Sequence, residues 1–127
     1  MKKTTFHKFR SEIYPIAIFV AITDDYEAIN ERFCDLSGES LKPQSFCDAW
    51  VQPVISKEDS ERVILVCFVE KKGTTSSIIA HEALHVADIM GNWLGLDWLN
   101  NGCNEAYAYL MQWVVKCCNI VIKGKED

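Results

Sequence analysis

Two histidines that lie four residues apart are the feature that most constrains this chain. His81 and His85 enclose the sequence His-Glu-Ala-Leu-His, in which Glu82 is the acid. Residues four apart lie one turn apart on the same face of an α-helix, so both imidazoles can reach one metal ion. Glu82 is offset from that line, where it can hold a water molecule beside the metal and accept its proton. The pattern therefore predicts a site for one zinc ion on a helix.

The flanking sequence predicts the helix itself, over residues 74–90. Thr74 or Thr75 can cap its N-terminus, and Gly91 is expected as the left-handed residue just after its end. Apolar residues around the motif indicate that the helix is mostly buried. A buried His-Glu-His face without a ligand would be costly, which favours a bound metal ion. The alternative is a set of polar residues on a helix surface that binds no metal.

A catalytic zinc site normally has three protein ligands and an open position for water. Glu105 is the best candidate for the third ligand, because it follows His85 by twenty positions and is the single acid of an apolar helix expected over 103–122. The alternative is an acid that the helix dipole favours at a helix start. Tyr109, one turn later, shares the face of Glu105. It can donate a hydrogen bond to a developing oxyanion, or it only packs as an aromatic ring.

Three other donors are weaker candidates. Cys103 could bind zinc as a thiolate in place of Glu105, and His7 is distant in sequence within a basic segment. Asp88 follows His81 by seven residues, a rise of about 10.5 Å along a helix, which is too far for both to bind one ion. Asp88 better fits an acceptor for the second ring nitrogen of a histidine ligand, or a surface acid.

The remaining sequence predicts one α+β domain over 1–127, with helices packed on a small mixed or antiparallel sheet. The expected order is β-α-β-β-α-α, with strands at 13–22, 49–55 and 62–70 and helices at 24–36, 74–90 and 103–122. Thr23 is the expected cap of the first helix. Pro15 and Pro53 point to strand beginnings or sheet edges, since proline donates no hydrogen bond to a sheet. The strand at 62–70 is apolar on both faces and should lie centrally or be covered.

Composition excludes several classes of partner. The 127 residues carry a net charge of −5 without a basic run, which argues against binding to nucleic acid or an anionic membrane. The longest apolar tract contains polar residues and falls short of the roughly 20 residues that a bilayer requires. None of the six cysteines forms a C-x-x-C pair, and Cys67 lies within an apolar run. We therefore expect reduced thiols in the core, a cytoplasmic location and no signal peptide.

A resemblance to a known family rests on two segments. They are the motif at 81–85 and the later sequence Asn104-Glu105-Ala106-Tyr107-Ala108-Tyr109. Together they resemble the gluzincin type of zinc metallopeptidase, over about residues 74–113. The resemblance implies a zincin-like fold, with His81, His85 and Glu105 as zinc ligands and Glu82 as general base. The short chain is more similar to small metallopeptidase-like proteins of bacteria and their phages than to secreted gluzincins.

The function expected from this resemblance is a zinc-dependent hydrolase that cleaves a peptide or protein substrate. A strand at a sheet edge would align the substrate by backbone pairing. Trp93 and Trp98 would line the cleft, or else pack in the core or a lid. Two alternatives remain open: an interaction module that a metal stabilises without catalysis, and a metal-dependent amidohydrolase that acts on a non-peptide amide.

Overall fold

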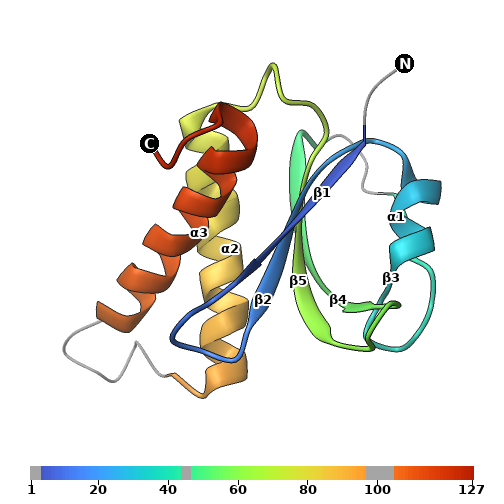
Figure 1. The fold of residues 1–127 in the computed structure, drawn as a ribbon, viewed down its shortest axis with the longest axis horizontal. Coiled ribbons are helices and arrows are strands. Elements are labelled where there is room, and N and C mark those ends of the chain that lie inside the picture. The colour runs from blue at the N-terminus through green and yellow to red at the C-terminus, as the bar shows by residue number, and fades with distance from the viewer. Residues whose placement is uncertain (1–3, 44–46, 97–104) are drawn as a thin grey trace. The chain divides into compact units, whose positions relative to one another are not determined.

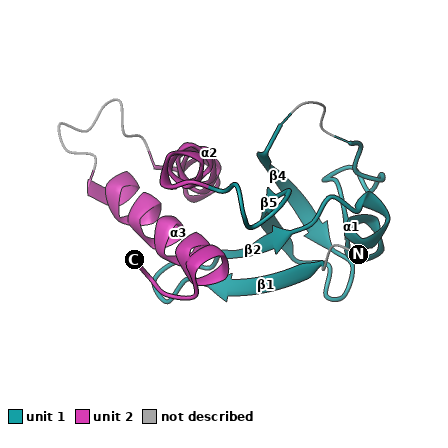
Figure 2. Cartoon of the chain, turned by 90° about the horizontal axis from the view of Figure 1, so that it is seen from above, with its two compact units in different colours: residues 1–74 teal, residues 75–127 magenta. Residues whose placement is uncertain are grey.

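The computed structural model describes residues 4–43, 47–96 and 105–127. Contacts divide the chain into two compact units, residues 1–74 and 75–127 (Figure 2). The described elements, in chain order, are β1 (Thr5–Arg10), β2 (Ala17–Ile22), α1 (Tyr26–Arg32), β3 (Phe33–Cys34), β4 (Ala49–Ser56), β5 (Arg62–Phe68), α2 (Ser76–Leu94) and α3 (Glu105–Lys123) (Figure 1). The first unit holds the sheet and α1, and the second holds α2 and α3. The predicted α+β class is confirmed.

The first unit is built on a mixed sheet with the strand order β1-β2-β5-β4-β3. β2 and β5 run parallel, with Val20 opposite Val66, and the other neighbouring strands are antiparallel. β5 lies at the centre, and every residue after Arg62 in it is buried. The prediction that the strand at 62–70 is central is therefore confirmed, because its two apolar faces both have to be covered.

α1 packs on one face of this sheet around a buried cluster that includes Phe33 of β3. Figure 1 shows α1 on that side of the strands. The ring of Phe33 meets Phe19 edge-on at a centroid distance of 5.0 Å, and Ile29 of α1 is fully buried beside them. Arg32 covers the aromatic group, with its guanidinium carbon 4.7 Å from the ring centroid of Phe6. An arginine above aromatic rings adds a cation–π attraction to the apolar packing.

Two short strands were absent from the predicted order. β1 pairs with β2, but its sequence contains a histidine, a lysine and an arginine and so lacks a strong strand pattern. β3 begins at Phe33, where the predicted helix at 24–36 was expected to continue. The backbone at Phe33 is extended, with φ −135 and ψ 156. Burying this ring in the sheet core overrides the helical spacing that had placed it in the helix.

The start of β2 differs from the prediction for a local reason. The expected strand at 13–22 begins only at Ala17. The hydroxyl of Ser11 accepts hydrogen bonds from the backbone N–H groups of Ile13 and Tyr14, at 3.2 and 3.0 Å, which holds these residues in a turn. Pro15 therefore precedes a strand and does not mark an edge, since β2 lies between β1 and β5.

The other proline, Pro53, fits an edge position. It lies in β4 opposite Ile64 of β5. On the other side of β4, β3 pairs only with Ile55 and Ser56. Within the described residues, Pro53 therefore faces no partner strand on that side, and its missing N–H breaks no ladder bond.

Helix ends were predicted with mixed success. Thr75 caps α2 as expected, because its hydroxyl accepts from the backbone N–H of Ile78 at 3.3 Å. The cap of α1 is Asp25 and not Thr23. The prediction that the helix at 74–90 ends before Gly91 is wrong. α2 continues to Leu94, and Gly95 takes the left-handed conformation with φ 72.

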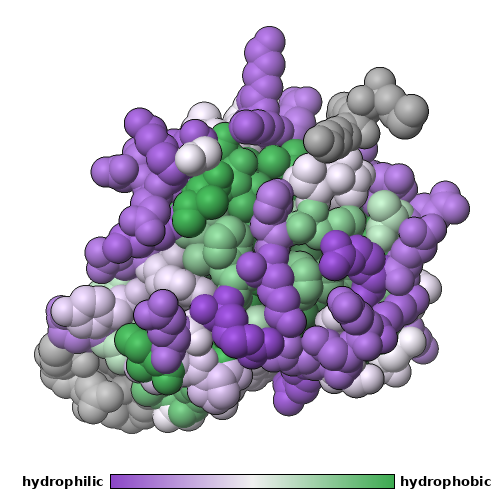
Figure 3. All heavy atoms as spheres, in the orientation of Figure 1, coloured by the Kyte–Doolittle hydropathy of each residue, from purple (hydrophilic) through white to green (hydrophobic). Residues whose placement is uncertain are grey.

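The surface combines polar and apolar residues. The face drawn in Figure 3 shows hydrophobic side chains among hydrophilic ones. The exposed large hydrophobic residues include Ile13, Leu84 and Tyr109. Among the described residues, neither α2 nor α3, nor the shorter α1, combines the length and hydrophobicity needed to cross a bilayer.

Glu61 joins the edge strand β1 to the turn before β5. Its carboxylate accepts hydrogen bonds from Arg10, at 2.8 and 3.0 Å, and from the ammonium of Lys8 at 3.1 Å. The bonds from Arg10 contribute most to a pKa of Glu61 below its ordinary value, with help from Lys8 and against partial burial. Glu61 thus neutralises the positive charges of Lys8 and Arg10, which made β1 difficult to predict as a strand.

We expect Glu61→Gln to lower the free energy of unfolding by less than about 1 kcal/mol near neutral pH, since the group is partly exposed. Because the folded-state pKa is lowered, this contribution is present above the ordinary glutamate pKa of about 4.3 and is lost as the pH falls through and below it. Urea unfolding at neutral and acidic pH measures the difference. Glu58→Gln, in the same turn, is the control and should change little. A loss that does not vary with pH would contradict the assigned ion pair.

Candidate metal centre

The two faces of α2 differ sharply in exposure. Buried residues recur at helical spacing along one face: Ile79, Glu82, Ala83, Val86, Ala87 and Met90. His81 and His85 lie on the opposite, exposed face, and the side chain of His81 is 69% exposed. The expectation of a buried His-Glu-His face on a mostly buried helix is therefore wrong for the histidines and holds for Glu82, whose side chain is 8% exposed. An exposed imidazole needs no metal ion to offset a desolvation penalty. The case for a metal site therefore depends on the geometry of the two histidines.

The two imidazoles converge at the nitrogens that a metal would use. Nε2 of His81 and Nε2 of His85 are 3.3 Å apart, and the ring centroids are 5.0 Å apart with planes inclined by 69°. Two nitrogens on a tetrahedral zinc, each at about 2.0–2.1 Å, are separated by roughly 3.3 Å. The same 3.3 Å is also the length of a hydrogen bond between the rings, in which Nε2 of one neutral imidazole donates to Nε2 of the other. The separation therefore fits two ligands of one zinc ion and equally fits a ring-to-ring hydrogen bond.

Glu82 lies beside this pair without being hydrogen-bonded to it. Its Oε2 atom is 3.9 Å from Nε2 of His81, which is too long for a hydrogen bond. Burial raises the pKa of Glu82 above its ordinary value, and the nearby His81 and His85 oppose that shift. A carboxylate with a raised pKa is a stronger base, so it is well suited to accept a proton from water.

The buried side of Glu82 is directed toward α3. Burial raises the pKa of Cys118 to about 12, and the charge of Glu82 adds to that shift. Cys118 is fully buried within the second unit. The sequence predicted an apolar helix over 103–122. It did not predict that the thiol of Cys118 lies near Glu82, the candidate base.

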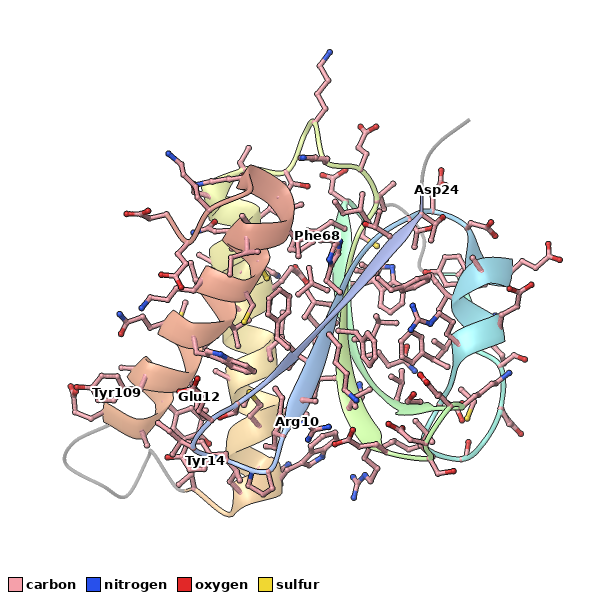
Figure 4. All side chains as sticks on the ribbon, viewed as in Figure 1. Arg10, Glu12, Tyr14, Asp24, Phe68 and Tyr109 are labelled. Atoms are coloured by element: carbon pink, nitrogen blue, oxygen red, sulfur yellow. The ribbon has the colours of Figure 1, made fainter. Side chains whose placement is uncertain are left out.

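Glu105 and Tyr109 share an exposed face of α3, as their spacing predicted. Glu105 is the first residue of the helix, and Tyr109 is 64% exposed. Figure 4 shows Tyr109 projecting outward from the N-terminal part of α3. Within the described residues, Glu105 does not form a metal-binding group with the histidine pair.

The packing of the two helices explains this placement. α2 and α3 run antiparallel (Figure 1), with Nζ of Lys123 donating to the hydroxyl of Ser76 at 3.3 Å and Tyr107 packed on Gly91. Glu105 is therefore level with the C-terminal end of α2. His85 lies six residues before Gly91, a rise of about 9 Å. Among residues 4–43, 47–96 and 105–127, no group of three His, Cys, Asp or Glu side chains is arranged to hold a metal ion.

The structure thus brings together His81, His85 and Glu82, and it leaves the third ligand as a prediction. The weaker candidates do not replace Glu105. His7 lies in β1 of the first unit, Asp88 is exposed on α2, and Cys103 lies outside the described residues, as does Trp98. Trp93, the other tryptophan considered for a cleft, is half-buried near the end of α2.

Two further cysteines, Cys67 and Cys117, are poor zinc ligands because burial keeps them protonated. Burial raises the pKa values of Cys67 and Cys117 to about 12. A thiol that keeps its proton at neutral pH is neither a nucleophile nor a good zinc ligand. These residues instead fill the core, as the sequence predicted.

Comparison with known proteins adds no homologue. No family model matches the chain, and no curated protein or solved structure matches it. The chemical fit is therefore the argument for zinc. Two imidazole nitrogens separated by a tetrahedral edge, with a buried carboxylate adjacent, match the ligand type and spacing that zinc prefers.

Proposed function

We propose that this chain is a zinc-dependent, metallopeptidase-like hydrolase with a minimal zincin-like architecture. The observation that carries the proposal is the 3.3 Å separation of the Nε2 atoms of His81 and His85, beside the buried carboxylate of Glu82. The substrate is a peptide or protein, and the proposed location is the cytoplasm. The resemblance of the motif to gluzincins and the spacing of the nitrogens both support this function, and both rest on His81 and His85.

In this proposal His81 and His85 bind the metal through Nε2, and Glu105 is the third ligand. Bound zinc supplies a Lewis acid that polarises the substrate carbonyl and acidifies water. Because Glu105 lies apart from the pair in the structure, its participation requires the start of α3 to approach the middle of α2 when the metal is present. Tyr109 would move with it and donate a hydrogen bond to the oxyanion.

Glu82 performs the proton transfers. Its carboxylate accepts a proton from the attacking water as the oxygen bonds to the carbonyl carbon. The same proton then passes to the leaving amine when the C–N bond breaks, so Glu82 returns to the carboxylate form. The raised pKa of Glu82 favours the first transfer, and its neutral form is a competent acid for the second.

Zinc binding is the first test of this function. At ten times its dissociation constant, zinc should stabilise the folded protein by about 1.4 kcal/mol. Isothermal titration calorimetry should give one ion per chain, and the unfolding temperature should rise with zinc. His81→Ala should abolish both effects, and Glu105→Gln should weaken binding. His7→Ala, which replaces the third histidine of the chain, is the control and should bind zinc like the wild type. Equal binding by the His81 and His7 variants would refute the site.

A further inference from the structure

The exposed face of α2 offers two ligands to a zinc ion. The imidazoles of His81 and His85 are both exposed, and their Nε2 atoms are 3.3 Å apart, within reach of one ion. In the part of the chain that the structure describes, no third His, Cys, Asp or Glu side chain joins them in a metal-binding group. Zinc in proteins takes four ligands in a tetrahedral arrangement, so two positions of an ion held by this pair have to be filled from elsewhere.

A second copy of this chain carries a matching pair of ligands. In the proposed hydrolase, Glu105 has to approach the pair before it can bind the ion. The histidines of a second copy are already convergent and exposed, so they can fill both positions without any change in α2 or α3. Two identical patches that meet across a twofold axis form the commonest kind of protein dimer. Such a dimer would hold one zinc ion with four imidazole nitrogens.

The surroundings of the histidine pair suit contact with a second copy. Leu84, which lies between the two histidines in the sequence, is 52% exposed. Ala80 is exposed as well, and its small side chain leaves room beside the ring of His81. Covering Leu84 with the partner removes apolar surface from water, which favours association.

Charge makes this contact depend on the ion. Each chain carries a net charge of −5, so two copies repel each other at long range. The sequence of α2 contains no lysine or arginine, and its acids are Glu82 and Asp88. A divalent cation between two such helices offsets the repulsion and meets no positive charge from α2. We therefore expect metal-free chains to be monomeric.

We propose that two copies of this chain share one zinc ion through His81 and His85 of each copy. This inference rests on the metal site of the proposed function and adds its regulation. Four nitrogens leave no position for water or substrate, so the dimer is the inactive form and the monomer is the active one. Because one ion serves two chains, the dimer prevails when zinc is scarce. Excess zinc gives each chain its own ion and separates the copies.

Sedimentation velocity of the full-length protein measures the dimer directly. The metal-free wild type should sediment as a monomer, dimerise at half an equivalent of zinc and return to the monomer at two equivalents. His85→Ala should stay monomeric at every zinc concentration, whereas His7→Ala, the control, should dimerise like the wild type. A wild type that binds zinc and stays monomeric would overturn the inference and leave the proposed function standing. A wild type that binds no zinc would refute both.

A variant that keeps all ligands tests the interface. Leu84→Ser should weaken the zinc-dependent dimer by about tenfold, since each dimer loses two apolar contacts. Ile13→Ser, at an exposed hydrophobic residue of the first unit, is the control and should dimerise like the wild type. An unchanged dimer in Leu84→Ser would overturn the proposed interface.

Activity tests the regulatory role separately. Peptide cleavage per bound ion should be lower at half an equivalent of zinc, where the dimer prevails, than at two equivalents. Cleavage by the dimer at the rate of the monomer would overturn the inactive state.

Discussion

Glu82→Gln should reduce peptide hydrolysis by about 10²–10⁴-fold, the usual contribution of general acid–base catalysis, while zinc binding is retained. Glutamine has almost the same size and shape but cannot accept a proton from water at neutral pH. The side chain is buried, and burial already disfavours its charge, so the neutral amide should not destabilise the fold. Zinc content by atomic absorption and cleavage of a quenched peptide library measure the two properties separately.

Glu58→Gln, which removes an exposed acid in the first unit, is the matched control and should cleave like the wild type. Equal cleavage by the Glu82 variant and the wild type, both with one zinc, would show that Glu82 is not the base. A zinc-loaded wild type that cleaves no peptide would favour the non-catalytic, metal-stabilised module. Cleavage of small amides without cleavage of peptides would favour the amidohydrolase.

Gly91→Ala should lower the free energy of unfolding by about 3 kcal/mol, as overpacking in a core does. In an ordinary helix interior the same change stabilises by roughly 0.5–1 kcal/mol. The sign reverses here because a Cβ at position 91 would overlap the ring and hydroxyl of Tyr107. Tyr107 also donates a hydrogen bond to the backbone carbonyl of Leu96 at 3.3 Å, so the ring cannot move away without losing that bond. Urea unfolding measures the effect.

Two further variants test this explanation. In a Tyr107→Ala background the added methyl group at position 91 has room, and Gly91→Ala should then be neutral or stabilising. Gly73→Ala is the control, because its new Cβ would meet its nearest neighbour, the carboxylate of Glu70, only at an ordinary 3.8 Å. A loss at position 91 that persists without the tyrosine ring would show that the contact is not its cause.

Local rules read from the sequence predicted much of the framework. They gave the α+β class, the central strand that became β5, the helix that carries the motif and its cap at Thr75. Spacing also placed His81 and His85 on one face, since a helix repeats every 3.6 residues whatever surrounds it. These features depend on neighbouring residues, and a single sequence contains that information.

Long-range contacts decided the rest. β1 is a strand because it pairs with β2 and because Glu61 neutralises its charges. Phe33 lies outside the helix because its ring fills the sheet core. Gly91 lies inside α2, where its lack of a Cβ gives room for Tyr107 from α3.

The site shows the same division between local and tertiary information. The sequence by itself determined that two imidazoles and one carboxylate lie within a turn of each other on one helix. Only the tertiary structure decided that the imidazoles are exposed and that Glu82 is buried. It also decided that Glu105 lies near the C-terminal end of α2. The physical reason is that periodicity assigns residues to a face of a helix, whereas packing against other elements determines which face is covered and which residues lie level with it.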